Sequence, residues 1–162
     1  MADPSHDTPL DAGLAARRLQ ADTFLNFAQL GRLVDRIVAE LFDEAGLNDV
    51  TPAQGGALMI LFQERAPMTA RQLAARMGLS QVTVGRFVKA LHAAGWISRK
   101  PCPDDARAVL LSPTAKAMRA LPRFIHVSNT LFDRAFADLG DTTIRRIAAT
   151  TERLRRNLEA SS

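Results

Sequence analysis

A pattern of small and apolar residues between positions 72 and 91 constrains the fold of this chain more than any other feature. Ala74, Gly78 and Val84 follow one another at intervals of four and six residues, which is the spacing of a helix-turn-helix. A small residue lets the second helix cross close over the first, and glycine ends the first helix because it tolerates a positive φ angle. The apolar seam between the helices is expected from Leu73, Met77, Leu79, Val84, Phe87, Val88 and Leu91. An ordinary helical hairpin with a polar outer face is the alternative interpretation.

The face of the second helix that the seam leaves open carries mostly polar and cationic side chains. Its residues are Ser80, Gln81, Val82, Thr83, Arg86 and Lys89. Gln81 and Arg86 have the donor geometry that base edges in a major groove require. Hydroxyl and ammonium groups suit phosphate oxygens, so Ser80, Thr83 and Lys89 are expected there. We therefore predict that this helix reads DNA.

The charge of the chain is segregated, although the net charge of its 162 residues is only +4. Residues 1–64 have a net charge of −6, residues 65–107 of +6 and residues 108–162 of +4. A basic block inside a nearly balanced chain is typical of a nucleic-acid-binding module. Scattered arginines on a solvated surface are the alternative interpretation of these charges.

Hydrophobic periodicity and capping residues predict a mainly α-helical chain with a small β-hairpin. The expected helices cover about residues 15–45, 52–66, 70–77, 81–94, 113–139 and 142–158, and the expected strands cover residues 96–100 and 108–111. The expected caps and stops are Gly46, Thr51, Thr69, Gly78, Ser80 and Gly95. Pro113 is expected to start its helix, and Pro122 to kink or split it.

These elements suggest four parts. We expect a mobile tail at 1–14, a dimerisation helix at 15–48, a winged helix-turn-helix at 51–112 and C-terminal dimerisation helices at 113–160. A helix of about 30 residues is about 45 Å long, which is more than a small domain can cover. Part of its apolar stripe is therefore expected to contact a second copy of the chain.

The hairpin after the second helix turns the helix-turn-helix into a winged one, and the sequence here resembles the MarR family of bacterial transcriptional regulators. The resemblance is carried by LSQVTV at 79–84, by residues 91–97 and by PDDARAVLLSPT at 103–114. The Asp-x-Arg pair in the wing, followed by an apolar strand and a threonine, is the most specific part. The order of elements extends the resemblance over roughly residues 15–160.

The resemblance implies a homodimer on a pseudo-palindromic operator, with repression as the usual mode. Arg107 falls at the wing arginine that enters the minor groove in this family, and Asp105 at the carboxylate that orients it. A narrow minor groove attracts a guanidinium because its negative potential is enhanced. Arg99 and Lys100, in the strand before the wing turn, are further candidate DNA contacts. The alternative interpretation is that Asp105 and Arg107 form an ion pair that only stabilises the wing turn.

The resemblance also implies a small aromatic or phenolic effector. Plausible apolar walls of its pocket are Phe24, Phe27, Leu61 and Phe62, for which a place in the hydrophobic core is the alternative. The sequence departs from the family pattern at Gly85, Ala106, Pro113 and Ala117. The first two weaken the expected DNA contacts, and they keep open a winged-helix protein-interaction module without DNA binding.

The sequence offers few residues for metal binding, disulfide formation or catalysis. His6, His92 and His126 are far apart, and the single cysteine excludes a disulfide framework and a zinc cage. Cys102 is either a redox-sensing thiol at the wing tip or a lone exposed cysteine. The acidic start does not resemble a signal peptide, and no run approaches the roughly 18 apolar residues of a membrane span. We expect a cytoplasmic protein that is not an enzyme and has no cofactor.

Overall fold

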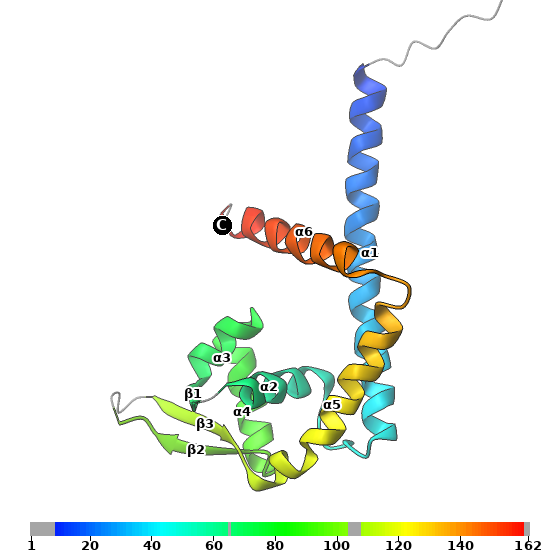
Figure 1. Ribbon diagram of the computed structural model, residues 1–162. Coiled ribbons are helices and arrows are strands. Elements are labelled where there is room, and N and C mark those ends of the chain that lie inside the picture. Colours follow the sequence, from blue (N-terminus) through cyan, green and yellow to red (C-terminus); the bar gives the residue numbers. More distant parts are fainter. Residues whose placement is uncertain (1–8, 65, 104–107, 161–162) are drawn as a thin grey trace, which may run out of the picture. The chain divides into compact units, whose positions relative to one another are not determined.

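The computed structural model describes residues 9–64, 66–103 and 108–160. Its elements are α1 (Pro9–Glu44), α2 (Pro52–Gln63), β1 (Met68–Thr69), α3 (Ala70–Met77), α4 (Gln81–Ala93), β2 (Ile97–Pro101), β3 (Val109–Pro113), α5 (Ala115–Ala135) and α6 (Asp141–Glu159) (Figure 1). The predicted fold class, mainly α with a small β-hairpin, is confirmed. The chain divides into two compact units, residues 1–56 and 57–162.

In the first unit, α1 is longer than the sequence analysis predicts. It begins at Pro9, inside the segment expected to be a tail, rather than near residue 15. Proline suits the first turn of a helix, because the N–H groups there have no partner within the helix. Gly46, with a φ of 66°, follows the end of the helix as predicted. The Leu47 N–H then donates to the Phe42 carbonyl at 2.8 Å.

The start of α2 packs against the end of α1 within this unit. Thr51 Oγ1 accepts a hydrogen bond from the Gln54 N–H at 3.3 Å, and Gln54 Oε1 accepts one from the Thr51 N–H at 3.0 Å. This reciprocal pair is a capping box at the predicted cap. A Cβ atom on Gly55 would lie 2.8 Å from Phe42 Cε2 and closer still to Cζ. Only glycine therefore lets α2 approach the buried Phe42 ring so closely.

The second unit contains one antiparallel sheet with the strand order β1-β3-β2. The predicted hairpin is β2–β3, which pairs from Ile97 with Pro113 to Pro101 with Val109. Two-residue β1 is not predicted by the sequence analysis, and pairs with Leu110 and Leu111. The expectation that Pro113 starts a helix is wrong, because it is the last residue of β3. It lies beyond the residues that pair with β1, where a strand tolerates proline.

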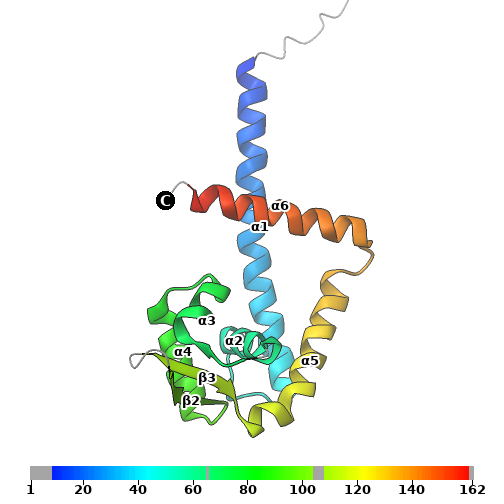
Figure 2. The same ribbon diagram turned by 60° about the vertical axis from the view of Figure 1, so that its left-hand side comes forward.

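The helix-turn-helix is formed by α3 and α4, and both views show the β2–β3 hairpin beside α4 (Figure 1 and Figure 2). Ala74 is buried, as expected for the small residue at a helix crossing. Gly78 has a φ of 64° and ends α3. Within the predicted seam, Leu73, Val84, Val88 and Leu91 are buried and Met77 and Phe87 are half-buried. Leu79 corrects the prediction, since it is 41% exposed.

An aromatic cluster joins α5 to the rest of this unit. The ring centroid of Phe124 lies 5.8 Å from that of Phe62 on α2 and 5.8 Å from that of Trp96. Phe124 and Trp96 are each 1% exposed. The rings of Phe124 and Trp96 are therefore part of the buried core of this unit, with Phe62 at its edge.

The last two helices differ from their predicted bounds. Thr114 caps α5, accepting a hydrogen bond from the Ala117 N–H at 3.3 Å, and α5 ends at Ala135 rather than near residue 139. The helix continues through Pro122. Proline removes one backbone hydrogen bond, but buried residues anchor the helix on both sides of it. α6 begins at Asp141 and buries none of its residues.

Candidate nucleic-acid interface

Local capping fixes both ends of α4. Ser80 Oγ accepts a hydrogen bond from the Thr83 N–H at 3.1 Å and lies 2.9 Å from Thr83 Oγ1. At the other end, Gly95 has a φ of 75°, and the Trp96 N–H donates to the Leu91 carbonyl at 2.8 Å. The predicted cap and stop are therefore both confirmed.

The outer face of α4 is open to solvent. Val84, Val88 and Leu91 bury the inner face. On the outer face, the exposed residues include Ser80, Gln81, Val82, Arg86 and Lys89, and Thr83 is half-buried. Because Val82, Arg86 and Lys89 follow at intervals of four and three residues, they form one row along the helix. This face presents an amide, a guanidinium and an ammonium group around an apolar side chain.

The C-terminal end of α4 is held by the first turn of α5. Lys116 Nζ donates to the Ala94 carbonyl at 2.9 Å and lies 4.2 Å from the centre of the Trp96 ring. Thr114 Oγ1 donates to the Gly95 carbonyl at 2.7 Å. These contacts join residues about 20 positions apart, so helical periodicity does not reveal them. They make Lys116 and Thr114 positioning residues for α4.

The hairpin places further cations beside α4. Arg99 and Lys100 are exposed on β2, where their Cα partners on β3 are Leu111 and Leu110. The predicted wing residues Asp105 and Arg107 lie outside the described residues. The described part of the wing is thus basic, with two adjacent cationic side chains on one strand.

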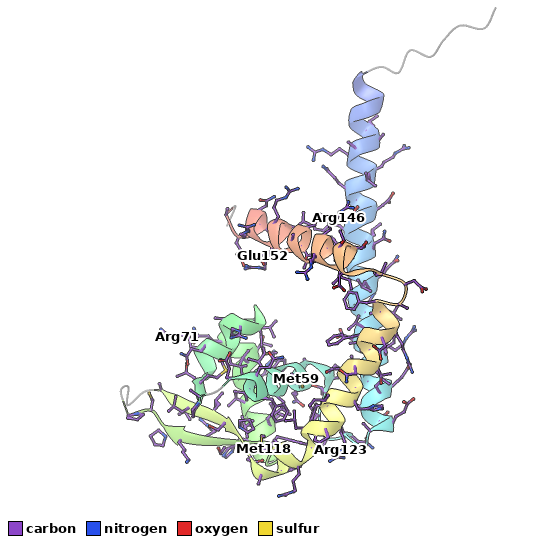
Figure 3. All side chains as sticks on the ribbon, in the orientation of Figure 1. Met59, Arg71, Met118, Arg123, Arg146 and Glu152 are labelled. Atoms are coloured by element: carbon purple, nitrogen blue, oxygen red, sulfur yellow. The ribbon has the colours of Figure 1, made fainter. Side chains whose placement is uncertain are left out.

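A hollow of about 350 Å³ lies where α3, α4 and the wing meet. Its lining residues are Thr69, Ala70, Arg71, Gln81, Val88, Arg99, Ala108, Val109 and Leu111. Two guanidinium groups, Arg71 and Arg99, border it, and the described lining contains no carboxylate. Figure 3 shows Arg71 on α3. Arg71 is not among the predicted site residues, because only the pairing of β1 with β3 brings the start of α3 to the wing.

Not every cation near the helix-turn-helix is available in the same way. Arg76, on α3, forms an ion pair with Glu64 through its Nη1 atom. Its charge is therefore balanced locally, whereas the described contacts give no such carboxylate partner to Arg71, Arg86 or Lys89. The outer face of α4 and the adjoining hollow together carry the cations Arg71, Arg86, Lys89 and Arg99.

Two of the four predicted pocket residues belong to the first unit and two to the second. Phe24 and Phe27 are 54% and 39% exposed on α1, with their ring centroids 6.2 Å apart. On α2, Leu61 is buried and Phe62 is half-buried against Phe124. The core interpretation therefore holds for Leu61, while the role of all four in effector binding stays a prediction.

Cys102 and the possible metal ligands are the remaining candidates from the sequence. Cys102 is half-buried rather than exposed, and its N–H donates to the Ala108 carbonyl at 3.0 Å. Within residues 9–64, 66–103 and 108–160, no three His, Cys, Asp or Glu side chains are grouped so that they could hold a metal ion. In the same residues, no helix is both long and apolar enough to span a membrane.

Known proteins resemble this chain both in sequence and in fold. Residues 50–109 match the model of the MarR family. YcgE, an HTH-type transcriptional regulator of Bacillus subtilis, is 28% identical over 112 residues, which cover 62% of this chain and 73% of YcgE. CouR from Rhodococcus jostii RHA1, solved with p-coumaroyl-CoA, has a TM-score of 0.72 and 20% identity over 84% of this chain and 93% of CouR. Reduced AbfR, solved bound to DNA, has a TM-score of 0.74 and 18% identity over 90% of this chain and 99% of AbfR.

The matched segment contains the surface described above. Residues 50–109 extend from the turn before α2 to the first residue of β3, and so include α3, α4 and β2. The TM-scores of 0.72 and 0.74 show that CouR and AbfR share the fold of this chain. The segment that matches the MarR family model is therefore the segment that folds as a winged helix-turn-helix.

Proposed function

We propose that this chain is a sequence-specific DNA-binding transcriptional regulator that acts in the cytoplasm as a homodimer on a pseudo-palindromic operator. The observation that carries the proposal is the outer face of α4, where Gln81, Val82, Arg86 and Lys89 are exposed beside a basic wing. An α-helix fits a major groove, and such side chains bind base edges and phosphates there. The DNA in the AbfR structure supports the same use of this fold.

Each side chain of α4 has a role in this proposal. Gln81 and Arg86 donate to base edges, and Lys89 binds a phosphate. Ser80 and Thr83 share a hydrogen bond in the helix cap, but a hydroxyl can both donate and accept, so each retains capacity for a phosphate. The N-terminal end of α4 therefore enters the groove, as recognition helices do.

The wing extends the contact along the DNA. Arg99 and Lys100 are proposed to bind phosphates from β2. Arg107 is proposed to enter the minor groove, with Asp105 orienting its guanidinium so that less ordering is needed on binding. Arg71, across the hollow from β2, adds a cation on the same side.

Salt dependence tests the proposal most directly. We expect wild-type protein to enrich a palindromic duplex from a randomised pool, which is called the selected duplex below. If each subunit neutralises three phosphates, the logarithm of affinity should fall with the logarithm of salt concentration with a slope of about −5. Fluorescence anisotropy of the labelled selected duplex at several salt concentrations measures this slope.

A scrambled duplex of equal composition is the control, and it should bind more weakly with a similar dependence on salt. Retention on heparin followed by release at moderate salt is a second readout. If no duplex is enriched and heparin does not retain the protein, the proposal is wrong and a protein-interaction module replaces it.

Exposed apolar side chains support the homodimer. Large ones lie on α1, α5 and α6, and include Leu25, Leu30, Phe132, Ile147 and Leu158. A soluble monomer seldom leaves so many uncovered, and residues 15–48 and 113–160 are the proposed dimerisation segments. Light scattering should give about twice the 17.7 kDa mass of the chain. Phe132→Glu should shift the mass towards that of one chain, because it places a charge in the proposed interface.

Leu79→Glu is the matched control for this measurement, since Leu79 is also exposed but lies between α3 and α4, outside both proposed dimerisation segments. It should leave the mass at twice that of the chain. A wild-type mass of a single chain at micromolar concentration would contradict the homodimer.

A small aromatic or phenolic effector and a repressor role complete the proposal. The p-coumaroyl-CoA in the CouR structure supports an aromatic ligand. Phe24, Phe27, Leu61 and Phe62 remain the proposed apolar contacts. The effector can control DNA binding if its affinity for the DNA-bound form of the dimer differs from its affinity for the released form.

A further inference from the structure

Val82 has an exposure that the fold does not explain. At 76%, it is the most exposed large hydrophobic side chain in the part of the chain that the structure describes. It lies on α4 opposite the buried side chains of Val84, Val88 and Leu91. Arg86 and Lys89 follow it in the same row. Val82 is therefore the apolar first member of a row that continues with two cations.

Stability of the helix does not require valine at this position. The cap of α4 is formed by Ser80 and Thr83 without the Val82 side chain. Valine is a weaker helix former than alanine because branching at Cβ restricts its rotamers. An exposed valine at the start of α4 thus contributes little to folding, which leaves binding as its use.

Gly85, three residues after Val82, is also not required by the fold. A Cβ atom there would meet nothing within 4 Å, and Gly85 is not among the described residues with a positive φ. Glycine inside a helix lowers stability relative to alanine. It does, however, leave α4 without a side chain beside Val82 and Arg86, so a bound molecule can approach the helix closely at this point.

In a DNA major groove, the C5 methyl group of thymine is the apolar feature that base edges offer, and apolar side chains contact it. We propose that Val82 reads a thymine methyl group in each half-site, and that Gly85 allows the helix to come close enough for this contact. The inference rests on the proposed function and assigns part of its sequence preference. An apolar protein partner fits less well, because Arg86 and Lys89 follow the valine in the same row of the helix.

Replacing thymine with deoxyuridine tests the inference, because it removes only the methyl group. Each thymine of the selected duplex is replaced in turn, symmetrically in both half-sites. At one position, wild-type affinity should fall about fourfold for each half-site, the effect of one buried methyl group. Val82→Ala should bind the thymine and deoxyuridine duplexes equally at that position. Val82→Thr, which retains one methyl group on a branched Cβ, should keep part of the difference.

Met118→Ala is the matched control, because it truncates another exposed apolar side chain outside α4. It should retain the wild-type ratio of affinities for the thymine and deoxyuridine duplexes. Gly85→Ala should keep the helical circular dichroism of the wild type but bind the selected duplex more weakly. Unchanged affinity in Gly85→Ala would overturn the close approach.

The outcomes separate this inference from the proposed function. If no duplex is enriched at all, the proposed function fails. If a duplex is enriched with salt-dependent affinity but Val82→Ala retains the wild-type ratio at every thymine, DNA binding stands and the role of Val82 is wrong. A selected duplex without thymine in its half-sites would also overturn the inference.

Discussion

Arg86→Ala is expected to weaken binding to the selected duplex about 10- to 100-fold, which corresponds to about 1–3 kcal/mol for a lost base contact. Arg86 is exposed in the central row of α4 and has no role in the buried seam. Arginine and alanine are both good helix formers, so the fold should be retained. Anisotropy titrations with the selected and scrambled duplexes measure the loss, which should be larger for the selected duplex.

Two further variants identify the kind of contact. Arg86→Lys keeps the charge but loses the bidentate fork, so it should retain the salt slope while discriminating less between the two duplexes. Arg153→Ala removes an exposed charge of the same kind on α6 and should bind like the wild type. Arg107→Ala should also lose affinity if the wing enters the minor groove. Unchanged affinity in both Arg86→Ala and Arg107→Ala would contradict the assigned roles.

Phe124→Ala is expected to lower the free energy of unfolding by about 3–5 kcal/mol, because it removes a buried ring and leaves a cavity. The ring contacts those of Phe62 and Trp96 at centroid distances of 5.8 Å. Urea unfolding followed by circular dichroism measures the change. Wild type and variant must be compared at one protein concentration, because association of folded chains raises apparent stability.

Phe124→Leu is the control, since it keeps most of the apolar volume and should cost less than about 1.5 kcal/mol. Truncation of a buried phenylalanine costs about 3–5 kcal/mol. If Phe124→Ala lowers the free energy of unfolding by less than about 1 kcal/mol, the aromatic cluster is not the core of this unit.

Features set by neighbouring residues were predictable from the sequence. The Thr69 and Ser80 caps each involve a residue three positions later, and Gly78 and Gly95 have the positive φ angles that their positions predict. The buried and exposed faces of α4 also follow from helical periodicity, because residues three and four apart share a face. Within the candidate site, this places Gln81, Val82, Arg86 and Lys89 on the outer face of one helix.

Features that depend on distant residues were not predictable in this way. β1 consists of two residues, and only pairing with Leu110 and Leu111 makes it a strand. That pairing brings Arg71 to the hollow beside Arg99, although no local pattern connects the two residues. Lys116 lies in an unremarkable helical turn, and its contact with Ala94 spans 22 residues. Pro113 was assigned to the wrong element because a proline is also common at the start of a helix.

The contacts of Lys116 and Thr114 join the C-terminal end of α4 to the start of α5, so a movement of α5 would be passed to α4 at this pivot. From this pivot to Ser80, the 13 residues of α4 span about 20 Å. A rotation of α5 that carried the pivot with it by about 10° would move the far end of α4 by about 3.5 Å, which is close to the 3.4 Å rise of one base step. A small angular change in α5 would thus displace the N-terminal end of α4 by a distance comparable to one base step.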